Sequence, residues 1–360
     1  MSRNSIGKNL VITSFGESHG SFVGAVIDGF PAGLSISSED LQVEMNRRRP
    51  GQSALTTQRS ETDEIQIISG VFEGKTLGTP IAILIANQDV RSDDYLHLKD
   101  VYRPGHADLL YDVKYGHRDW RGGGRSSARI TAAWVAAGAL AKQWINHQSS
   151  VKINAWVSQI ATIKAPSIVA VTRDDIESSV VRCPHLESSN QMIALIEEAK
   201  VNGDSLGGKI TCLIEGLPQG LGEPVFGKLN AILGQYILNL NAVKGISFGD
   251  GFDAAELSGS NHNDEWIFRE DLGRIGTRTN HSGGIVGGMS TGEPVKMEIA
   301  FKPTSTIAKE QITVNASLEE VKLQAKGRHD PCVLPRAVPI VEALCYLAIM
   351  DLWLESPAKL

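Results

Sequence analysis

The sequence predicts one large α/β domain over residues 1–360, and three observations indicate it. Apolar, strand-like segments such as residues 22–28 alternate irregularly with helical segments such as residues 37–49. No linker of low complexity and no short-period repeat divides the chain. The strands are not evenly spaced between helices, which argues against a doubly wound parallel sheet.

The first half of the chain contains clear start and stop signals. Ser37 or Ser38 can cap a helix that Pro50-Gly51 ends. The Ala-rich residues 130–145 are apolar on all sides, which is typical of a buried helix. We also expect a helix at residues 105–116, and strands at residues 9–14, 22–28, 65–69 and 81–86.

The second half repeats this mixture. Its expected strands are residues 151–163, 208–215 and 295–301, and its expected helices are residues 188–201, 226–238 and 333–354. The apolar run 333–350 is interrupted by Pro335, Arg336, Pro339 and Glu342. It therefore predicts a buried helix, not a membrane span.

The composition excludes several classes of protein. With 42% apolar and 21% charged residues, the chain is typical of a soluble globular protein. The net charge of −6 argues against a general binder of nucleic acid or membrane surfaces. Four widely spaced cysteines and an N-terminus without an apolar signal segment favour free thiols and a cytoplasmic location.

The segment R-G-G-G-R-S-S-A-R at residues 121–129 has the features of an anion site. Its glycines let backbone N–H groups approach a ligand, and Arg121, Arg125 and Arg129 supply positive charge. A basic surface loop is the alternative. By contrast, G-D-S-L-G-G-K-I at residues 203–210 fails as a nucleotide phosphate loop, because Ile ends it and a strand-like run follows.

Other short segments are ambiguous one by one. G-E-S-H-G at residues 16–20 places His19 on a connection between two strands, where catalytic groups are common. His106 and Asp330 also lie in loops, where a polar turn residue or a helix cap is the plainer interpretation. His329 and Cys332 are too few to make a zinc site, so no metal is expected. Taken together, these segments indicate an enzyme acting on a small, multiply anionic substrate.

The combination of segments resembles the chorismate synthase family. G-E-S-H-G at 16–20, R-P-G-H-A-D at 103–108, R-G-G-G-R-S-S-A-R at 121–129 and R-H-D-P at 328–331 occur in that family's order and rough spacing. H-S-G-G-I-V-G-G at 281–288 and K-P-T-S-T at 302–306 also look like it. The resemblance covers essentially the whole chain.

The resemblance implies a lyase of the shikimate pathway, which supplies the aromatic amino acids. The reaction is the anti-1,4-elimination of phosphate and the C6 hydrogen from 5-enolpyruvylshikimate 3-phosphate, giving chorismate. Reduced FMN is required without net redox change, and NADPH is implied only as a reductant of the flavin. The implied fold is a β-α-β sandwich, with antiparallel sheets on either side of a helical layer, assembled as a homotetramer.

Residue roles follow by motif. His19 would be a general acid near the departing phosphate, His106 would contact the flavin pyrimidine edge, and Asp330 would act near flavin N5. The substrate would be bound by Arg48, Arg103, Arg129 and Arg328. The FMN site would be lined by Arg125, Ser126, Ser127, Asn241, Ala242, Gly287, Lys302, Pro303, Thr304, Ser305, Thr306 and Arg328.

One position departs from the family pattern, and two other function classes stay open. The family often has an arginine where this chain has Ala54, and we expect Arg59 to supply that contact. An NAD(P)H-dependent flavin reductase is the first alternative, although no G-x-G-x-x-G follows a strand. A non-catalytic anion- or RNA-binding protein is the second, although aromatic residues are not interleaved with the arginines.

Overall fold

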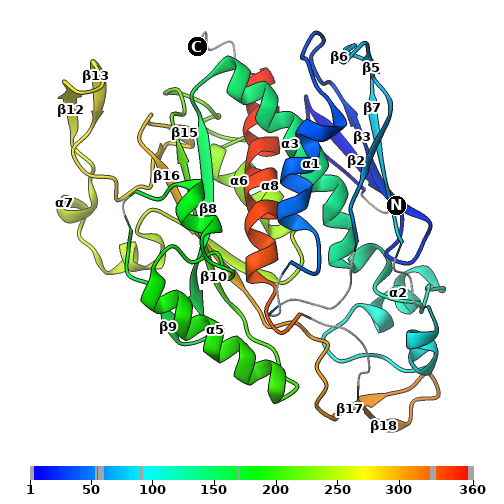
Figure 1. Cartoon of the computed structure of the whole chain (residues 1–360). Coiled ribbons are helices and arrows are strands. Elements are labelled where there is room, and N and C mark those ends of the chain that lie inside the picture. Colours follow the sequence, from blue (N-terminus) through cyan, green and yellow to red (C-terminus); the bar gives the residue numbers. More distant parts are fainter. Residues whose placement is uncertain are drawn as a thin grey trace.

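Two five-stranded antiparallel sheets enclose a layer of helices in the computed structural model (Figure 1). The structure describes residues 4–52, 55, 61–88, 92–168, 170–324 and 330–355. The sandwich implied by the resemblance and the α/β class predicted from the residues are both confirmed.

The first sheet is built from the N-terminal part of the chain. Its strand order is β1 (Ser5–Ile6), β2 (Val11–Phe15), β3 (Phe22–Asp28), β7 (Ile81–Ala86) and β4 (Ile65–Ser69). Val26 of β3 lies opposite Thr13 on one side and Ala82 on the other. Alternate residues of β3 and β7 are fully buried toward the helices, as a half-buried strand requires. A small hairpin, β5 (Val71–Phe72) with β6 (Lys75–Thr76), extends this region.

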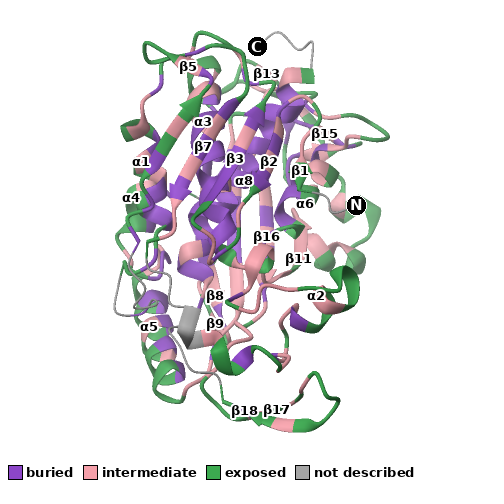
Figure 2. Cartoon of the chain, turned by 90° about the vertical axis from the view of Figure 1, so that its right-hand side faces the viewer, coloured by how far each residue is buried: buried purple, intermediate pink, exposed green. Residues whose placement is uncertain are grey.

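The second sheet has the order β11 (Val243–Phe248), β16 (Val295–Phe301), β10 (Gly208–Glu215), β8 (Lys152–Ile160) and β9 (Ile163–Lys164). Burial alternates strictly along β16, so every second side chain enters the core. Cys212 of β10 lies between Met297 and Ala155 of the neighbouring strands. Figure 2 shows the buried residues concentrated where the sheets face the helices.

Four helices fill the space between the sheets: α1 (Ser38–Arg48), α3 (Thr131–Gln148), α6 (Leu229–Leu238) and α8 (Leu334–Glu355). α1 and α3 pack on the first sheet, and α6 and α8 pack on the second. α3 and α8 pack directly on each other, with Gly138 against Ala343. A β-carbon at Gly138 would lie 2.7 Å from the α-carbon of Ala343, so only glycine permits this approach.

α8 is long and apolar enough to cross a membrane by length and composition, but 94% of its most apolar window is buried inside the protein. Its central place in the core explains that composition, as the sequence predicted. Asp351 near its end accepts the backbone N–H groups of Asn9 and Leu10 at 2.6 and 2.8 Å. α8 therefore anchors the start of the first sheet as well.

Further helices and hairpins lie around the two sheets and the four central helices. The peripheral α-helices are α2 (Asp108–Tyr115), α4 (Arg173–Glu177), α5 (Leu186–Val201) and α7 (Gly259–His262). The 3-10 turns are η1 (Ser92–Leu98), η2 (Gly124–Ser126), η3 (Ala128–Ile130) and η4 (Gly251–Glu256). Three hairpins pair β12 (Trp266–Arg269) with β13 (Arg274–Thr277), β14 (Ile285–Val286) with β15 (Met289–Ser290), and β17 (Gln311–Val314) with β18 (Glu320–Leu323).

Most expected elements are confirmed, with three corrections. The helix expected at 105–116 begins only at Asp108, because the residues before it form a turn in which His106 N–H donates to the Arg103 carbonyl. The strand expected at 151–163 ends at Ile160, and β9 follows a turn at Ala161, which has a φ of 46°. β11 and the short hairpins were not predicted. All four cysteines are buried free thiols, as expected.

Candidate active site

A cavity of about 450 Å³ lies where α1 ends and where α3 and α8 begin. This volume is in the usual range for small-molecule sites. Two helix N-termini at its edge favour bound negative charge. Most of the predicted site residues line it: His106, Asp330, Arg48, Arg103, Arg129, Ser126, Ser127, Asn241, Ala242, Lys302, Pro303, Thr304, Ser305 and Thr306.

Arg48 and Arg129 share one buried carboxylate, that of Asp63. Arg48 Nη1 donates to Asp63 Oδ2 at 2.6 Å, and Arg129 Nη1 donates to the other oxygen. Arg129 Nε also donates to Asn87 Oδ1 at 2.7 Å. Burial lowers the pKa of Arg48 to about 10, against the attraction of Asp63. Burial raises the pKa of Asp63, but the two guanidinium groups outweigh it and hold that pKa below its usual value.

Arg103 is held by Asp108, the first residue of α2. Its Nε and Nη2 donate to the two carboxylate oxygens, both at 2.7 Å, in the bidentate geometry typical of arginine. Arg118 Nη1 lies 3.4 Å from the same carboxylate. Burial raises the pKa of Asp108, but Arg103 lowers it by more. The guanidinium of Arg103 is therefore fixed in one orientation at the cavity wall.

The two ring nitrogens of His106 both have protein partners. Nδ1 lies 3.0 Å from the Pro104 carbonyl, which can only accept, so Nδ1 carries a hydrogen. Nε2 lies 2.7 Å from the Thr306 hydroxyl. Burial lowers the pKa of His106, and the charges of Arg103 and Lys302 lower it further. His106 is therefore a neutral imidazole at pH 7.

Asp330 and Arg336 form an ion pair at the start of α8. Arg336 Nη1 donates to Asp330 Oδ2 at 2.5 Å, and both side chains are largely buried. The Thr304 hydroxyl donates to the Asp330 backbone carbonyl at 3.1 Å. Asp330 thus lines the cavity beside the start of α8, and Arg336 holds one oxygen of its carboxylate.

The polar groups of the cavity are compatible with the flavin that the resemblance implies. Asn241 Nδ2 donates to the Ser126 carbonyl at 2.7 Å, while its buried Oδ1 has no partner among the described residues. A buried acceptor of this kind complements an N–H group, which the flavin ring carries. Lys302 Nζ donates to the Ser305 hydroxyl and offers a cation for a phosphate. The apolar wall is formed by Leu240, Ala242, Phe301, Val333, Ala337 and Ile340.

His19 lies beside this cavity and is not one of its lining residues. Its ring packs edge-on against Tyr95, which lines the cavity, with 4.8 Å between ring centroids. The Ser18 hydroxyl lies 3.1 Å from His19 Nδ1. The structure therefore brings His19 close to the cavity, with one aromatic ring between them.

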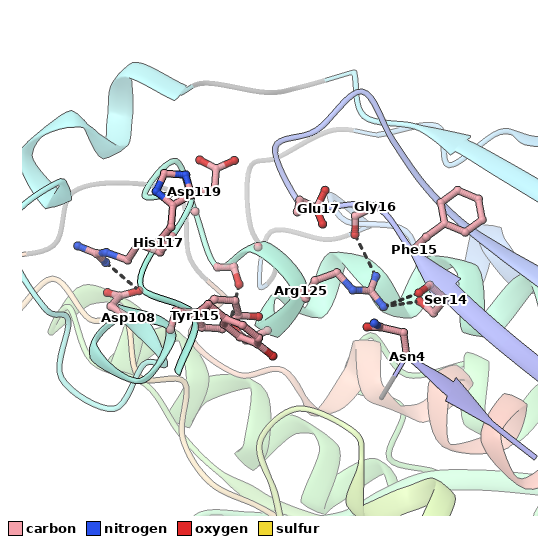
Figure 3. Close-up of a pocket in the computed structure, with 16 residues that line it drawn as sticks. Asn4, Ser14, Phe15, Gly16, Glu17, Asp108, Tyr115, His117, Asp119 and Arg125 are labelled. Carbon is pink, nitrogen blue, oxygen red and sulfur yellow. Dashed lines mark hydrogen bonds and ion pairs between the residues drawn. The ribbon is translucent and has the colours of Figure 1, made fainter. Parts of the chain in front are cut away.

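Arg125 faces a second cavity, of about 590 Å³, on the other side of the glycine-rich loop (Figure 3). Its Nη1 donates to the Gly16 carbonyl at 2.9 Å and its Nη2 to the Ser14 carbonyl at 2.8 Å, interactions drawn as dashed lines in Figure 3. Burial lowers the pKa of Arg125. Because Gly123 and Ser126 line both cavities, this loop is a wall common to the two.

The remaining predicted residues lie elsewhere. Gly287 is at the turn between β14 and β15 and lines neither cavity. Arg328, with Ala54 and Arg59, lies outside the described residues. The described part of the chain holds no group of three or more His, Cys, Asp or Glu side chains that could bind a metal ion.

Three residues of the site were missed by sequence reasoning: Asp63, Asp108 and Arg336. Asp108 lay inside a quoted motif, five residues after Arg103, and that spacing was a usable signal. Asp63 carried no local signal, because only tertiary packing brings it to both Arg48 and Arg129. Arg336 lies six residues after its partner Asp330, and that spacing was also a usable signal.

The comparisons with known proteins agree on one family. The chorismate synthase family model matches residues 10–354. The chain belongs to the chorismate synthase family. A chorismate synthase of Synechocystis sp. is 53% identical over 357 residues, covering 99% of this chain and 98% of that protein. One of Christiangramia forsetii is 51% identical, covering 100% and 99%.

The structural comparison gives the same result. A crystal structure of a chorismate synthase matches with a TM-score of 0.77 and 29% identity, covering 97% of this chain and 93% of that chain. Chorismate synthases are lyases that catalyse the last step of the shikimate pathway, and the family assignment gives this chain that activity. It also places the chain among the enzymes that act on a small-molecule substrate.

Proposed function

We propose that the protein eliminates phosphate and the C6 hydrogen from 5-enolpyruvylshikimate 3-phosphate in the 450 Å³ cavity, with reduced FMN bound beside the substrate. The supporting observation is the convergence of His106, Asp330 and the arginines at 48, 103 and 129 on one cavity. The wall carries a single carboxylate among its described residues, against five cations: Arg48, Arg103, Arg129, Lys302 and Arg336. A substrate with two carboxylates and a phosphate complements this excess of positive charge.

The arginines bind and orient the substrate. Arg48, Arg103 and Arg129 are already fixed by Asp63 and Asp108, so binding costs little further side-chain ordering. Their anionic partners behind the wall lower the net charge but leave guanidinium N–H groups for the ligand. We assign substrate binding to these three residues, and Arg328 remains a prediction.

We assign flavin binding to the polar groups of Ser126, Asn241 and residues 302–306, which line the same cavity. When bound, reduced FMN would donate an electron that promotes the elimination and would regain it at the end of the reaction. Ser127 and Ala242 line the same wall, while Arg125 and Gly287 remain predictions for this role. NADPH enters only as a reductant of the flavin.

Three side chains handle protons and hydrogen bonds. His19, beside the cavity, is the general acid for the departing phosphate. Neutral His106 would contact the flavin pyrimidine edge by exchanging the Nε2 hydrogen bond with the Thr306 hydroxyl for one with the flavin, a role that fits its lowered pKa. Asp330 would lie near flavin N5 and help the flavin to accept the C6 proton, and Arg336 keeps its carboxylate in place. We further propose a homotetramer in the cytoplasm.

An anaerobic assay tests the function. Purified protein is mixed with 5-enolpyruvylshikimate 3-phosphate and pre-reduced FMN, and chorismate and phosphate are measured. The same mixture with oxidised FMN and NADPH tests for an intrinsic flavin reductase. We expect product only with pre-reduced flavin. No product in either mixture would contradict the proposal and favour the flavin-reductase or binding-protein alternatives.

Variants test the residue roles in the same assay. His19→Ala, His106→Ala and Asp330→Asn should each lower turnover much more than they lower the melting temperature, because all three side chains lie on connections. Full activity of Asp330→Asn would remove that carboxylate from the mechanism. Equal losses of stability and turnover would make the histidines structural.

A further inference from the structure

The imidazole of His19 lies directly against the backbone of Gly122. A β-carbon built at Gly122 would be 2.6 Å from His19 Cε1, closer still to Nδ1, and 3.0 Å from the Ser18 hydroxyl. Carbon atoms in ordinary contact are 3.5–4.0 Å apart. Any side chain at this position would therefore push the imidazole away.

We infer that Gly122 is a positioning residue, which sets the place of the His19 imidazole beside the active-site cavity. This inference rests on the proposed function, because it assumes that His19 acts on the substrate. Among the described neighbours of the imidazole are the Gly122 backbone, the Ser18 hydroxyl and the edge of the Tyr95 ring. We call this arrangement the His19 socket.

Gly122 also touches the substrate-binding side of the site. It is buried, and its carbonyl accepts from Arg103 Nη2 at 3.4 Å. Gly122 of the glycine-rich loop therefore contacts both the proposed general acid, His19, and a proposed substrate-binding residue, Arg103. The backbone φ of 156° adds a reason for glycine here, so a test must separate this conformation from the contact with His19.

Gly116 is a matched control for the backbone effect. It has a φ of 69°, which also favours glycine, and no atom lies within 4 Å of a β-carbon built there. It ends α2 and lines neither cavity. Gly116→Ala therefore introduces an unfavourable backbone conformation without moving His19.

The first measurement is turnover. Gly122→Ala should lower kcat on the order of 100-fold, as expected for a catalytic group displaced by about 1 Å, with a smaller change in KM. Gly116→Ala should keep kcat close to the wild-type value. Equal effects of the two variants, or a change in KM alone, would overturn the inference.

A double-variant comparison identifies the residue through which Gly122 acts. If the effect passes through the imidazole, adding Gly122→Ala to His19→Ala should cause no further loss of kcat. An additional loss of the same size as in the wild-type background would overturn the inference. That result would instead indicate an effect through Arg103 or the loop backbone.

The Cε1–H resonance of His19, assigned by its absence in His19→Ala, provides a readout that needs no turnover. It is recorded in the full-length protein without substrate or flavin. Gly122→Ala should shift this resonance, whereas Gly116→Ala should not. An unchanged resonance in Gly122→Ala would overturn the inference. A shifted resonance in a protein whose wild type makes no chorismate would keep the socket and reject the proposed function.

Discussion

Asp63 is the charge on which two of the proposed substrate-binding arginines depend. It adopts a φ of 49°, an uncommon conformation that aspartate tolerates better than most residues, and its side chain is completely buried. Arg48 and Arg129 each donate to one of its oxygens. A single carboxylate thereby fixes the distance between two cavity cations.

Asp63→Asn should destabilise the protein by about 3–5 kcal/mol, because it leaves two buried guanidinium groups without their shared charge. The pKa of Asp63 is lowered in the folded protein, so its contribution is present above its ordinary value of 3.8 and is lost as pH falls through the folded value. Urea unfolding at pH 7 and at decreasing pH measures both effects. The exposed Asp253 provides the control variant Asp253→Asn. A smaller loss of unfolding free energy at pH 7 for Asp63→Asn than for Asp253→Asn would contradict the prediction.

His106 gives a pH dependence in a different window. Its pKa is lowered below 6.5 in the folded protein, chiefly by burial, so the unfolded chain takes up a proton first as pH falls. Stability from this group is therefore present above pH 6.5 and is lost on acidification. His106→Gln should lose less stability between pH 7 and pH 5 than the wild type, in melting experiments. The exposed His147→Gln is the control, and equal slopes for His106→Gln and wild type would refute the prediction.

At the scale of elements, the contact between α3 and α8 sets how closely these two core helices approach each other. Gly138 is the point of closest approach, because a β-carbon there would lie 2.7 Å from the Ala343 α-carbon and 2.8 Å from its carbonyl oxygen. Neither atom can move without shifting the α8 backbone. The separation of the two sheets therefore depends on residue 138 being glycine.

Two Gly→Ala variants in helices should change stability in opposite directions. Gly138→Ala should lower the free energy of unfolding by about 1–3 kcal/mol through overpacking. Gly234→Ala in α6, where no atom lies within 4 Å of the added carbon, should raise it by up to about 1 kcal/mol through helix propensity. Denaturant melts of the two variants and wild type test this. Stabilisation by Gly138→Ala would show that α8 can shift freely.

The elements were predictable where local signals were strong. The boundaries of α1 followed from Ser37, which forms a capping box with Asp40, and from Pro50. β3, β4, β7, β10 and β16 matched their apolar runs exactly. β11 was missed because Val243–Phe248 contains Lys and Gly and is an edge strand of intermediate burial, without the alternation that marks a half-buried strand.

At the scale of the whole molecule, the candidate active-site cavity is assembled from distant parts of the chain. Arg48, His106, Arg129, Lys302 and Asp330 reach it from five separate segments. The combination of motifs identified the family, and the five-residue spacing of Arg103 and Asp108 was a usable signal for that pair. No spacing in the sequence indicates that Arg48 and Arg129 share Asp63, because that pairing depends on tertiary packing.

The two sheets should unfold together. Both contribute to one continuous hydrophobic core, and the helices between them belong to both halves of the sandwich. Far-ultraviolet circular dichroism and the fluorescence of the six tryptophans, which include Trp156 of β8 and Trp134 and Trp144 of α3, should give coincident urea transitions. Separated transitions would indicate that residues 1–360 contain more than one folding unit.

The position of α8 in the chain has a consequence for biosynthesis. This helix lies between the sheets, yet residues 334–355 follow every strand that it touches. On the ribosome, the nascent chain completes β8 and β10 before the segment that covers their apolar faces has emerged. During that interval the unfinished protein exposes core surface, so we expect it to depend on chaperones more than proteins whose central helix is translated early.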